Sequence, residues 1–405
     1  MASMLPDNPS LNRLRVEART LQRQADAGVA DALDAVRRHH PRADIALAPD
    51  RFALHDAQLT VARRYGFSGW PGLVHFLEAA AALSVDPARI DENELSAADK
   101  FCSLSVLHYT EADAPPRWAA AAHLLAAAPE LVNDHIWAAA AANDPDALAR
   151  QLAAGATVTE KGGPLGWEPL LYLCYSRSPA TSLDQTLAAA TLLLDAGADP
   201  DAGYLWRGMS TPFTALTGVF GEGELGPRRQ PRHPFAADLA SLLLERGAHP
   251  VDQQALYNRM FRRDNSHLEL LFAHGLADAG PSPWERRLGE AMETRAQMWR
   301  RQISWAAEHG FSERLSMLAR HGVDTAGVAV AVADLPADPD ILDDNGATAL
   351  HHAAWDGDLE LIDRLLDAGA DPTIADAKFD ATPLGWAEYA YQSEAADRLR
   401  SAMRR

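Results

Sequence analysis

The chain has 405 residues, of which 47% are hydrophobic and 23% are charged, and its formal net charge is −19. This composition excludes a chain that is disordered throughout, and the length predicts two or three domains or one extended array of small units. The negative charge disfavours nucleic acid and anionic membranes as partners and favours a neutral or basic partner.

There are only two cysteines, Cys102 and Cys174, a number that excludes a disulfide framework and fits a reducing compartment, and both lie in apolar surroundings. The first residues lack the pattern of a secretory signal. No segment approaches the roughly 20 consecutive apolar residues that a membrane span needs. We therefore expect a cytoplasmic protein with no membrane contact and no nucleic-acid partner.

Residues 1–90 differ from the rest of the chain because they are more basic. Their pattern predicts an arginine-rich helix over residues 10–27 and a second helix over residues 30–39. Residues 55–80 predict a helix, an aromatic-rich turn and another helix. We treat residues 1–90 as one helical region, distinct from residues 91–405.

Downstream of this region the chain repeats itself. Each copy is an apolar helix that ends in glycine, and the terminal glycines are Gly155, Gly197, Gly247, Gly275, Gly322 and Gly369. They are 42, 50, 28, 47 and 47 residues apart, whereas a regular array of helix pairs has a spacing of about 33. The excess predicts insertions, and the one deficit predicts a shortened unit without a full helix hairpin. We expect degenerate repeats up to about residue 324.

Three insertions stand out, at residues 219–234, 280–298 and 324–343. The second has a helical pattern, and the third is rich in proline and aspartate. The first contains a local basic patch at residues 228–233. We interpret this patch as a solvated loop, with contact to an acidic partner or ligand as the alternative. Long insertions in a compact protein are usually functional or disordered.

The clearest unit spans residues 343–374. Asn345 and Gly346 predict a turn, and Thr348 is placed to cap a short helix of small side chains. A second helix follows with apolar residues at helical spacing, and Gly369 ends it. The unit is therefore a helix–turn–helix of about 33 residues.

This unit closely resembles the ankyrin repeat, whose Thr-Pro-Leu-His-x-Ala opening stands at residues 348–353 as Thr-Ala-Leu-His-His-Ala. The following unit, residues 375–405, restores the proline and resembles a C-terminal capping repeat. The resemblance implies an all-α, ankyrin-type solenoid over residues 91–405, interrupted by inserted loops. Residues 1–90 resemble the helical cap that precedes ankyrin arrays in some bacterial proteins.

In ankyrin-repeat proteins the turn tips and first helices line a concave surface that usually binds protein partners. The resemblance assigns to that surface Asp344, Asn345 and Ala347 at a tip, Trp355 and Asp356 at the end of a first helix, Tyr389 and Tyr175 at the matching helix ends of other units, and Trp206 and Arg207 at a tip between two units. Exposed aromatic residues suit binding hot spots because they supply large area with few rotamers. The resemblance implies a structural role for His351, as a hydrogen-bond partner of neighbouring backbone.

Motifs for catalysis or metal binding are absent from the sequence. The 15 histidines include no His-x-x-x-His pair, and there is neither a Cys-x-x-Cys pair nor a Gly-x-Ser-x-Gly elbow. We predict no metal and no cofactor.

Two classes of function stay open, and with them the question of whether the protein is an enzyme. The first is a protein–protein interaction scaffold that binds a partner on the concave face. The second is a small-molecule site or an acid–base enzyme of cyclase, isomerase or dehydratase type in the concave groove. Its first candidates, without assigned roles, are His352, Asp356, Glu388, Tyr175 and Arg207. An open groove would favour the first class, and a deep pocket holding acids with perturbed pKa values would favour the second.

Overall fold

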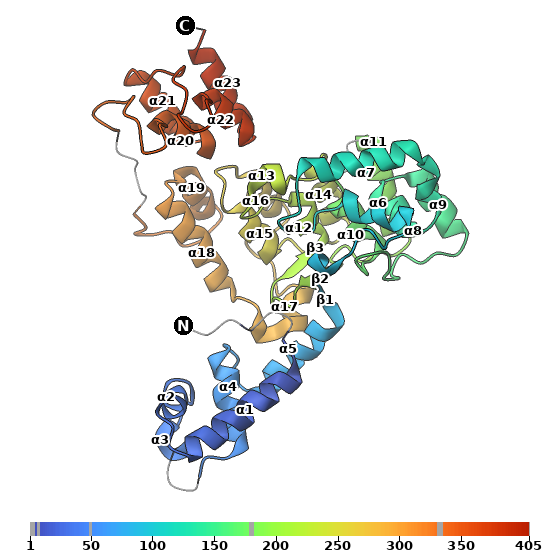
Figure 1. Ribbon diagram of the computed structural model, residues 1–405, viewed down its shortest axis with the longest axis vertical. Helices are drawn as coiled ribbons and strands as arrows, with labels where there is room; N and C mark the ends of the chain where they lie inside the picture. Colours follow the sequence, from blue (N-terminus) through green and yellow to red (C-terminus); the bar gives the residue numbers. More distant parts are fainter. Residues whose placement is uncertain (1–4, 6–8, 48–50, 178–181, 330–334, 405) are drawn as a thin grey trace.

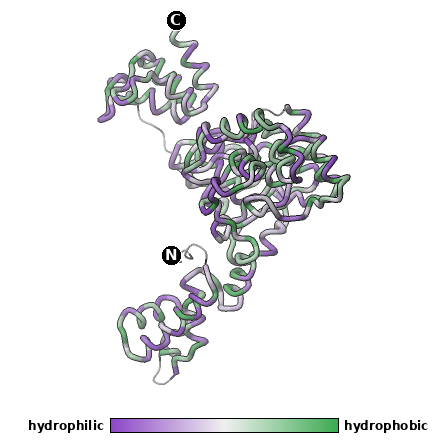
Figure 2. The backbone as a smooth tube through the Cα atoms, turned by 45° about the vertical axis from the view of Figure 1, so that its right-hand side comes forward, coloured by the Kyte–Doolittle hydropathy of each residue, from purple (hydrophilic) through white to green (hydrophobic). Residues whose placement is uncertain are grey.

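The computed structural model describes residue 5 and residues 9–47, 51–177, 182–329 and 335–404. It is mainly helical, as the sequence predicted, and its helices form three groups in chain order (Figure 1). The groups are N-terminal (α1–α5), central (α6–α19) and C-terminal (α20–α23). The same three groups can be distinguished in a view turned by 45° (Figure 2).

The N-terminal group consists of α1 (Leu11–Asp26), α2 (Ala30–His39), α3 (Ala43–Ala46), α4 (Leu54–Arg64) and α5 (Trp70–Leu83). The helices predicted near residues 10–27 and 30–39 are confirmed. The buried apolar side chains of this group share one cluster with Leu205, Trp284, Leu288 and Met292 of the central group. The N-terminal helices therefore pack on the central group, and a domain boundary near residue 90 stays a prediction.

Most of the central group is a series of short helices arranged in pairs. In chain order they are α6 (Ala97–Ser105), α7 (Pro115–Ala127), α8 (Ile136–Ala141), α9 (Pro145–Ala153), α10 (Pro169–Tyr175), α11 (Leu183–Asp195), α12 (Ala215–Phe220), α14 (Ala236–Glu245), α15 (Gln253–Arg259) and α16 (Ser266–Ala273). Three short 3-10 helices, η1 (Pro87–Arg89), η2 (Pro129–Asn133) and η3 (Gly289–Ala291), lie in the connections. Side-chain caps begin several helices: Asp144, for example, accepts a hydrogen bond from the backbone of Ala147 (2.9 Å).

Successive pairs stack in register. The first helices pack on one another in the order α6, α8, α10, α12 and α15, and the second helices in the order α9, α11, α14 and α16. Such a pair cannot bury its own apolar side, so each depends on its neighbours. The prediction that the shortened unit lacks a full hairpin is wrong: it keeps both helices, α15 and α16, and is shorter because it has less connecting chain.

A small sheet joins the N-terminal and central groups, which the sequence analysis did not foresee. Strand β2 (Gly203–Trp206) pairs with β3 (Pro212–Thr214) in antiparallel fashion and with β1 (Ser84–Val85) in parallel. Trp206 lies opposite Val85, and the backbone N–H of Arg207 donates to the Val85 carbonyl (2.8 Å). Trp206 and Arg207 therefore stand at the end of a paired strand.

The insertions differ in structure. The insertion at residues 280–298 contributes α17 (Pro283–Leu288) and the start of α18 (Arg295–Glu308), which confirms its helical pattern, and α19 (Ser312–Arg320) follows. The insertion at residues 219–234 forms a loop with one helical turn, α13 (Gly226–Arg229). In the third insertion, at residues 324–343, residues 330–334 lie outside the described residues.

The C-terminal group consists of α20 (Ala349–Asp356), α21 (Leu359–Asp367), α22 (Pro383–Tyr389) and α23 (Ser393–Ala402). We call these helices with their turns, residues 343–402, the C-terminal repeat pair. Leu350, Ile362, Leu365 and Leu399 are fully buried in its core. This cluster contains only side chains of the repeat pair, so the pair has a core of its own.

Candidate functional site

The two helix units of the C-terminal repeat pair are joined by a histidine. The backbone N–H of Thr348 donates to Nδ1 of His351 (3.0 Å), and Nε2 of the same ring donates to the Ala381 carbonyl of the next unit (3.1 Å). His351 is fully buried. The structural role that the resemblance implied for this histidine matches these contacts.

The turn before α20 is fixed by Asp343. Its Oδ1 accepts hydrogen bonds from the backbone of Asn345 (2.8 Å) and Ala347 (2.9 Å). Gly346 has a φ of 72°, and a Cβ there would lie 2.5 Å from the Cβ of Ala377. The turn therefore needs glycine both for its conformation and for its close approach to the next unit.

Four aromatic rings run across the first helices of the repeat pair. Trp355 and Tyr389 stack with centroids 5.8 Å apart and an interplanar angle of 25°. Trp386 lies edge-on to Trp355 (5.9 Å) and also contacts Phe379 (6.4 Å). The indole N–H of Trp386 donates to Oδ2 of Asp376 (2.9 Å), which fixes the ring. We call these four rings, Phe379, Trp386, Trp355 and Tyr389, the aromatic face.

This face is unusual in the molecule because its rings reach solvent. Trp355 is 37% exposed, Tyr389 is 52% exposed and Phe379 is 64% exposed. With the neighbouring Tyr391, they are all the exposed aromatic side chains in the part of the chain that the structure describes. The acids Asp356 and Glu388 are exposed beside them. The result is an apolar and acidic surface on one repeat pair.

A concave feature, the central cleft, lies between the N-terminal end of the central group and the loop at residues 221–234. It encloses about 840 Å³. Its walls include Tyr109, Trp206, Arg207, Phe213, Tyr257 and Asn258. The indole N–H of Trp206 donates to the His108 carbonyl (3.0 Å), and Arg207 donates to Asp86 (2.9 Å).

The acids with raised pKa values near this cleft are engaged in structural bonds. Burial raises the pKa of Asp113 to about 6, but its carboxylate accepts hydrogen bonds from the backbone of His108 and Thr110, both at 3.1 Å. Burial also raises the pKa of Asp252, whose oxygens bond to the Thr217 hydroxyl (3.0 Å) and to the backbone of Ala255 (2.8 Å). Each carboxylate therefore holds a loop or helix start in place.

The residues predicted from the repeat pattern lie in two surface regions and, in two cases, in the interior. Asp344, Asn345, Trp355, Asp356 and Tyr389 are exposed on the C-terminal repeat pair. Trp206 and Arg207 line the central cleft.

Two of the predicted residues are not at any surface, which corrects the prediction. Ala347 is 1% exposed because its side chain faces into the repeat pair. Tyr175 is 0% exposed: its hydroxyl donates to the Thr214 carbonyl (3.0 Å), and its ring packs against Trp167 (4.9 Å). Neither can contact a partner in this structure.

The sequence analysis missed Phe379 and Trp386. Phe379 lies in the turn before α22, one unit after the tip residues that the resemblance singled out, so the same rule applied once more would have found it. The cleft residues Tyr109 and Asn258 carried no such signal, because the repeat pattern there is degenerate.

None of the described helices is long and apolar enough to cross a membrane. Within the described ranges, no group of three or more His, Cys, Asp or Glu side chains could hold a metal ion.

Comparison with known proteins agrees with the geometry of the C-terminal part. A family model described as ankyrin repeats (many copies) matches residues 330–384, which contain α20, α21 and the start of α22. No curated protein matches the chain. The match supports the ankyrin resemblance for the segment that carries Trp355 and Phe379, two of the four residues of the aromatic face. Ankyrin repeats generally mediate protein–protein interaction.

Proposed function

We propose that the chain is a protein-binding scaffold that holds its partner on the aromatic face of the C-terminal repeat pair. In this proposal residues 91–405 form an ankyrin-type solenoid, the first helices line its concave side, and residues 1–90 form a helical cap of the kind found in bacterial ankyrin proteins. The proposal places the protein in the cytoplasm. The central cleft, with Trp206 and Arg207, supplies a second contact region.

One observation carries the proposal: the exposed aromatic side chains gather on one repeat pair. Elsewhere in the described chain, aromatic rings are buried or half-buried. Clustered apolar surface rimmed by polar groups is typical of interaction sites. Trp and Tyr are the residue types that most often dominate binding energy at such sites. Asp344, Asn345 and Asp356 supply the polar rim.

The acid–base alternative is not part of the proposal, because four of its five candidate residues are buried or engaged in other bonds and the fifth, Asp356, is exposed. Nε2 of His352 donates to Asp343 (2.9 Å), and Arg400 donates to Glu388 (2.6 Å). Arg207 pairs with Asp86 (2.9 Å), and Tyr175 is buried. None of these bonds joins one candidate residue to another.

The test is a pull-down: the protein is immobilised, and a lysate of the source cells is passed over it to find which partner it retains. We expect one protein to be retained at fixed stoichiometry by the wild type and by Tyr391→Ala, whose ring is 59% exposed and outside the aromatic face. Trp355→Ala should weaken that retention by about 30-fold, the equivalent of about 2 kcal/mol for a hot-spot residue. Equal retention by wild type, Trp355→Ala and Tyr389→Ala would overturn the proposal.

A further inference from the structure

One end of the aromatic face already holds a cation from the same chain. The guanidinium carbon of Arg228, in α13, lies 4.2 Å from the centroid of the Tyr389 ring. A cation over a ring face at this distance is attracted by the negative charge of the π system. The basic patch that the sequence analysis interpreted as a solvated loop thus contacts the face at which we place the partner.

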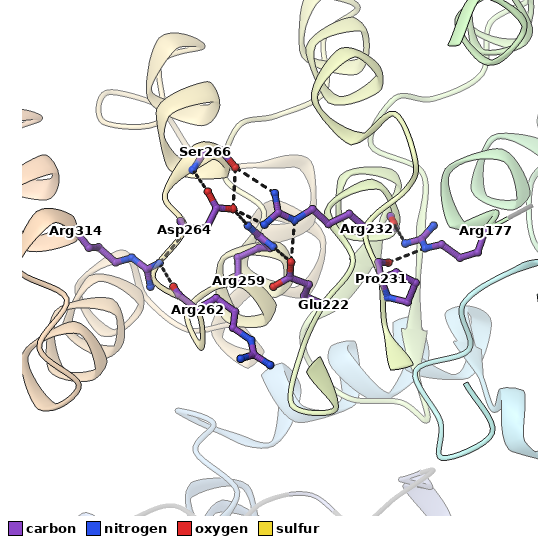
Figure 3. A network of polar contacts seen from close by, with 10 residues as sticks. Arg177, Glu222, Pro231, Arg232, Arg259, Arg262, Asp264, Ser266 and Arg314 are labelled. Carbon is purple, nitrogen blue, oxygen red and sulfur yellow. Dashed lines mark hydrogen bonds and ion pairs between the residues drawn. The ribbon is translucent and has the colours of Figure 1, made fainter. Parts of the chain in front are cut away.

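The loop that carries Arg228 is anchored on both sides. Arg229 donates to the Asp113 carbonyl (3.2 Å) and pairs with Glu111 (2.9 Å). Farther on, Arg232 pairs with the buried Glu222 (2.8 Å) and with Asp264, within the ion network shown in Figure 3. These contacts fix the loop on the central group, so that Arg228 is held in position against the repeat pair.

Two more arginines of the central group meet the same end of the repeat pair. Arg263 pairs with Asp358, which is the N-cap residue of α21. Desolvation raises the pKa of Asp356, and the positive charges of Arg262 and Arg263 oppose that rise. At this junction the central group thus supplies guanidinium groups, and the repeat pair supplies a ring and two acids.

Apolar burial contributes little to this junction. The buried core of the repeat pair shares no residue with the described clusters of the central group. The contact that a partner would have to displace is the exposed one between Arg228 and Tyr389, and a cation–π contact at an exposed site contributes only about 0.5–1 kcal/mol.

We propose that the aromatic face selects arginine side chains of its protein partner, and that Arg228 is an occupant in cis that such a partner displaces. This inference rests on the proposed function and names the chemistry of the partner. A planar guanidinium suits the face better than the ammonium of lysine, because it stacks on rings and donates to carboxylates at the same time. Asp356 and Glu388 are exposed beside the rings, and the Glu388 carboxylate, which already accepts from Arg400 (2.6 Å), has further lone pairs for a second guanidinium. The net charge of −19 favours the approach of a basic segment.

The experiment measures fluorescence anisotropy of labelled peptides with the full-length protein. The probes are a peptide with four arginines separated by Gly-Ser spacers and a matched peptide with lysine at the same positions. We expect the arginine peptide to bind the wild type more tightly than the lysine peptide. Arg228→Gln should bind the arginine peptide about two- to fivefold more tightly than wild type, because one cation–π competitor is removed.

Two controls isolate the ring and the charge. Tyr389→Leu should weaken binding of the arginine peptide by about two- to fivefold, whereas Tyr389→Phe, which keeps a ring, and Tyr391→Leu should bind like the wild type. Arg19→Gln removes the same charge as Arg228→Gln from an exposed position on α1. Its peptide affinity gives the part of the gain that is due to net charge alone.

The inference fails if Arg228→Gln gains no more affinity than Arg19→Gln, if Tyr389→Leu binds as tightly as Tyr389→Phe, or if the two peptides bind equally. If any of those results is found and Trp355→Ala still loses the partner, the proposed function is supported and only the preference for arginine is refuted. If Trp355→Ala also retains the partner, both proposals fall. Circular dichroism of each variant checks that the helices are intact. If Tyr389→Leu unfolds locally, the difference in peptide affinity between Arg228→Gln and Arg19→Gln still tests whether Arg228 competes with the peptide.

Discussion

The ion network beneath the Arg228 loop provides a direct test of how the central group is held together. The side chain of Arg259 is completely buried and pairs with Glu222, which is 4% exposed, and with Asp264. Arg232 is the second partner of both acids (Figure 3). Replacing Arg259 by methionine keeps much of the volume and removes the buried positive charge.

The expected cost follows from what the substitution leaves behind. Glu222 stays buried with Arg232 as its remaining ion-pair partner, and that arginine is 39% exposed and shared with Asp264. Breaking a buried pair from one side typically costs about 3–5 kcal/mol, because one charge is left uncompensated. For a unit the size of the central group this corresponds to a fall in Tm of about 6–20 °C.

The double variant Glu222→Gln/Arg259→Met separates this mechanism from simple loss of packing. It removes both buried charges, while Asp264 keeps Arg232 and the backbone N–H of Ser266 (3.0 Å). We expect it to recover most of the lost stability. Urea and thermal unfolding followed by far-ultraviolet circular dichroism provide the measurement. A double variant that is less stable than Arg259→Met, or an Arg259→Met protein as stable as wild type, would refute the reasoning.

Three further predictions concern other parts of the molecule. Because burial raises the pKa of Asp113 to about 6, the folded state holds this proton more tightly than the unfolded chain, and the free energy of unfolding should fall as the pH rises from 4 to 6. Asp113→Asn should remove up to about 3 kcal/mol of that pH dependence in urea titrations at pH 4 to 7, and an unchanged slope would contradict the assignment. A Cβ on Gly218 would lie 2.2 Å from the Tyr175 ring, so Gly218→Ala should cost about 1–3 kcal/mol in thermal unfolding, and an unaltered Tm would be inconsistent with this packing. Leu365→Ala should destabilise the C-terminal repeat pair by about 2–5 kcal/mol and leave the central group intact in limited proteolysis, because their cores are separate; joint digestion of both would show that they are coupled.

The sequence predicted best the features that depend on neighbouring residues. The second helices α11, α14 and α21 end two residues before Gly197, Gly247 and Gly369, whose φ values of 94° to 100° disfavour any other residue. Local capping and turn chemistry were enough to place these ends. The strands β1 and β2 were not predicted, because they lie more than a hundred residues apart and pair only once the N-terminal helices have packed on the central group.

The site was predictable only where the repeat is regular. Trp355 and Tyr389 occupy matching positions in α20 and α22, and both are exposed. Tyr175 occupies the same position in α10, yet its ring is covered by the hairpin residue Tyr204 (5.9 Å) and lies against Gly218 of the next unit. The inserted hairpin and the missing side chain at position 218 are both outside the repeat pattern, so the pattern alone could not show that Tyr175 is buried.

This contrast also bears on why the aromatic face is uncovered. In the central group, the ring of Tyr175 at the end of α10 is built into a cluster with Trp167, Tyr204 and Phe213, where it stabilises the fold. In the C-terminal repeat pair, Trp355 and Tyr389 remain at the surface, where their apolar area lowers solubility and contributes little to the core. A fold that has the means to bury such rings, and does so elsewhere, has no structural need for them here. Their exposure is therefore better explained by a partner that covers them than by packing, and Arg228, which lies over the face of the Tyr389 ring, indicates the kind of side chain that would do so.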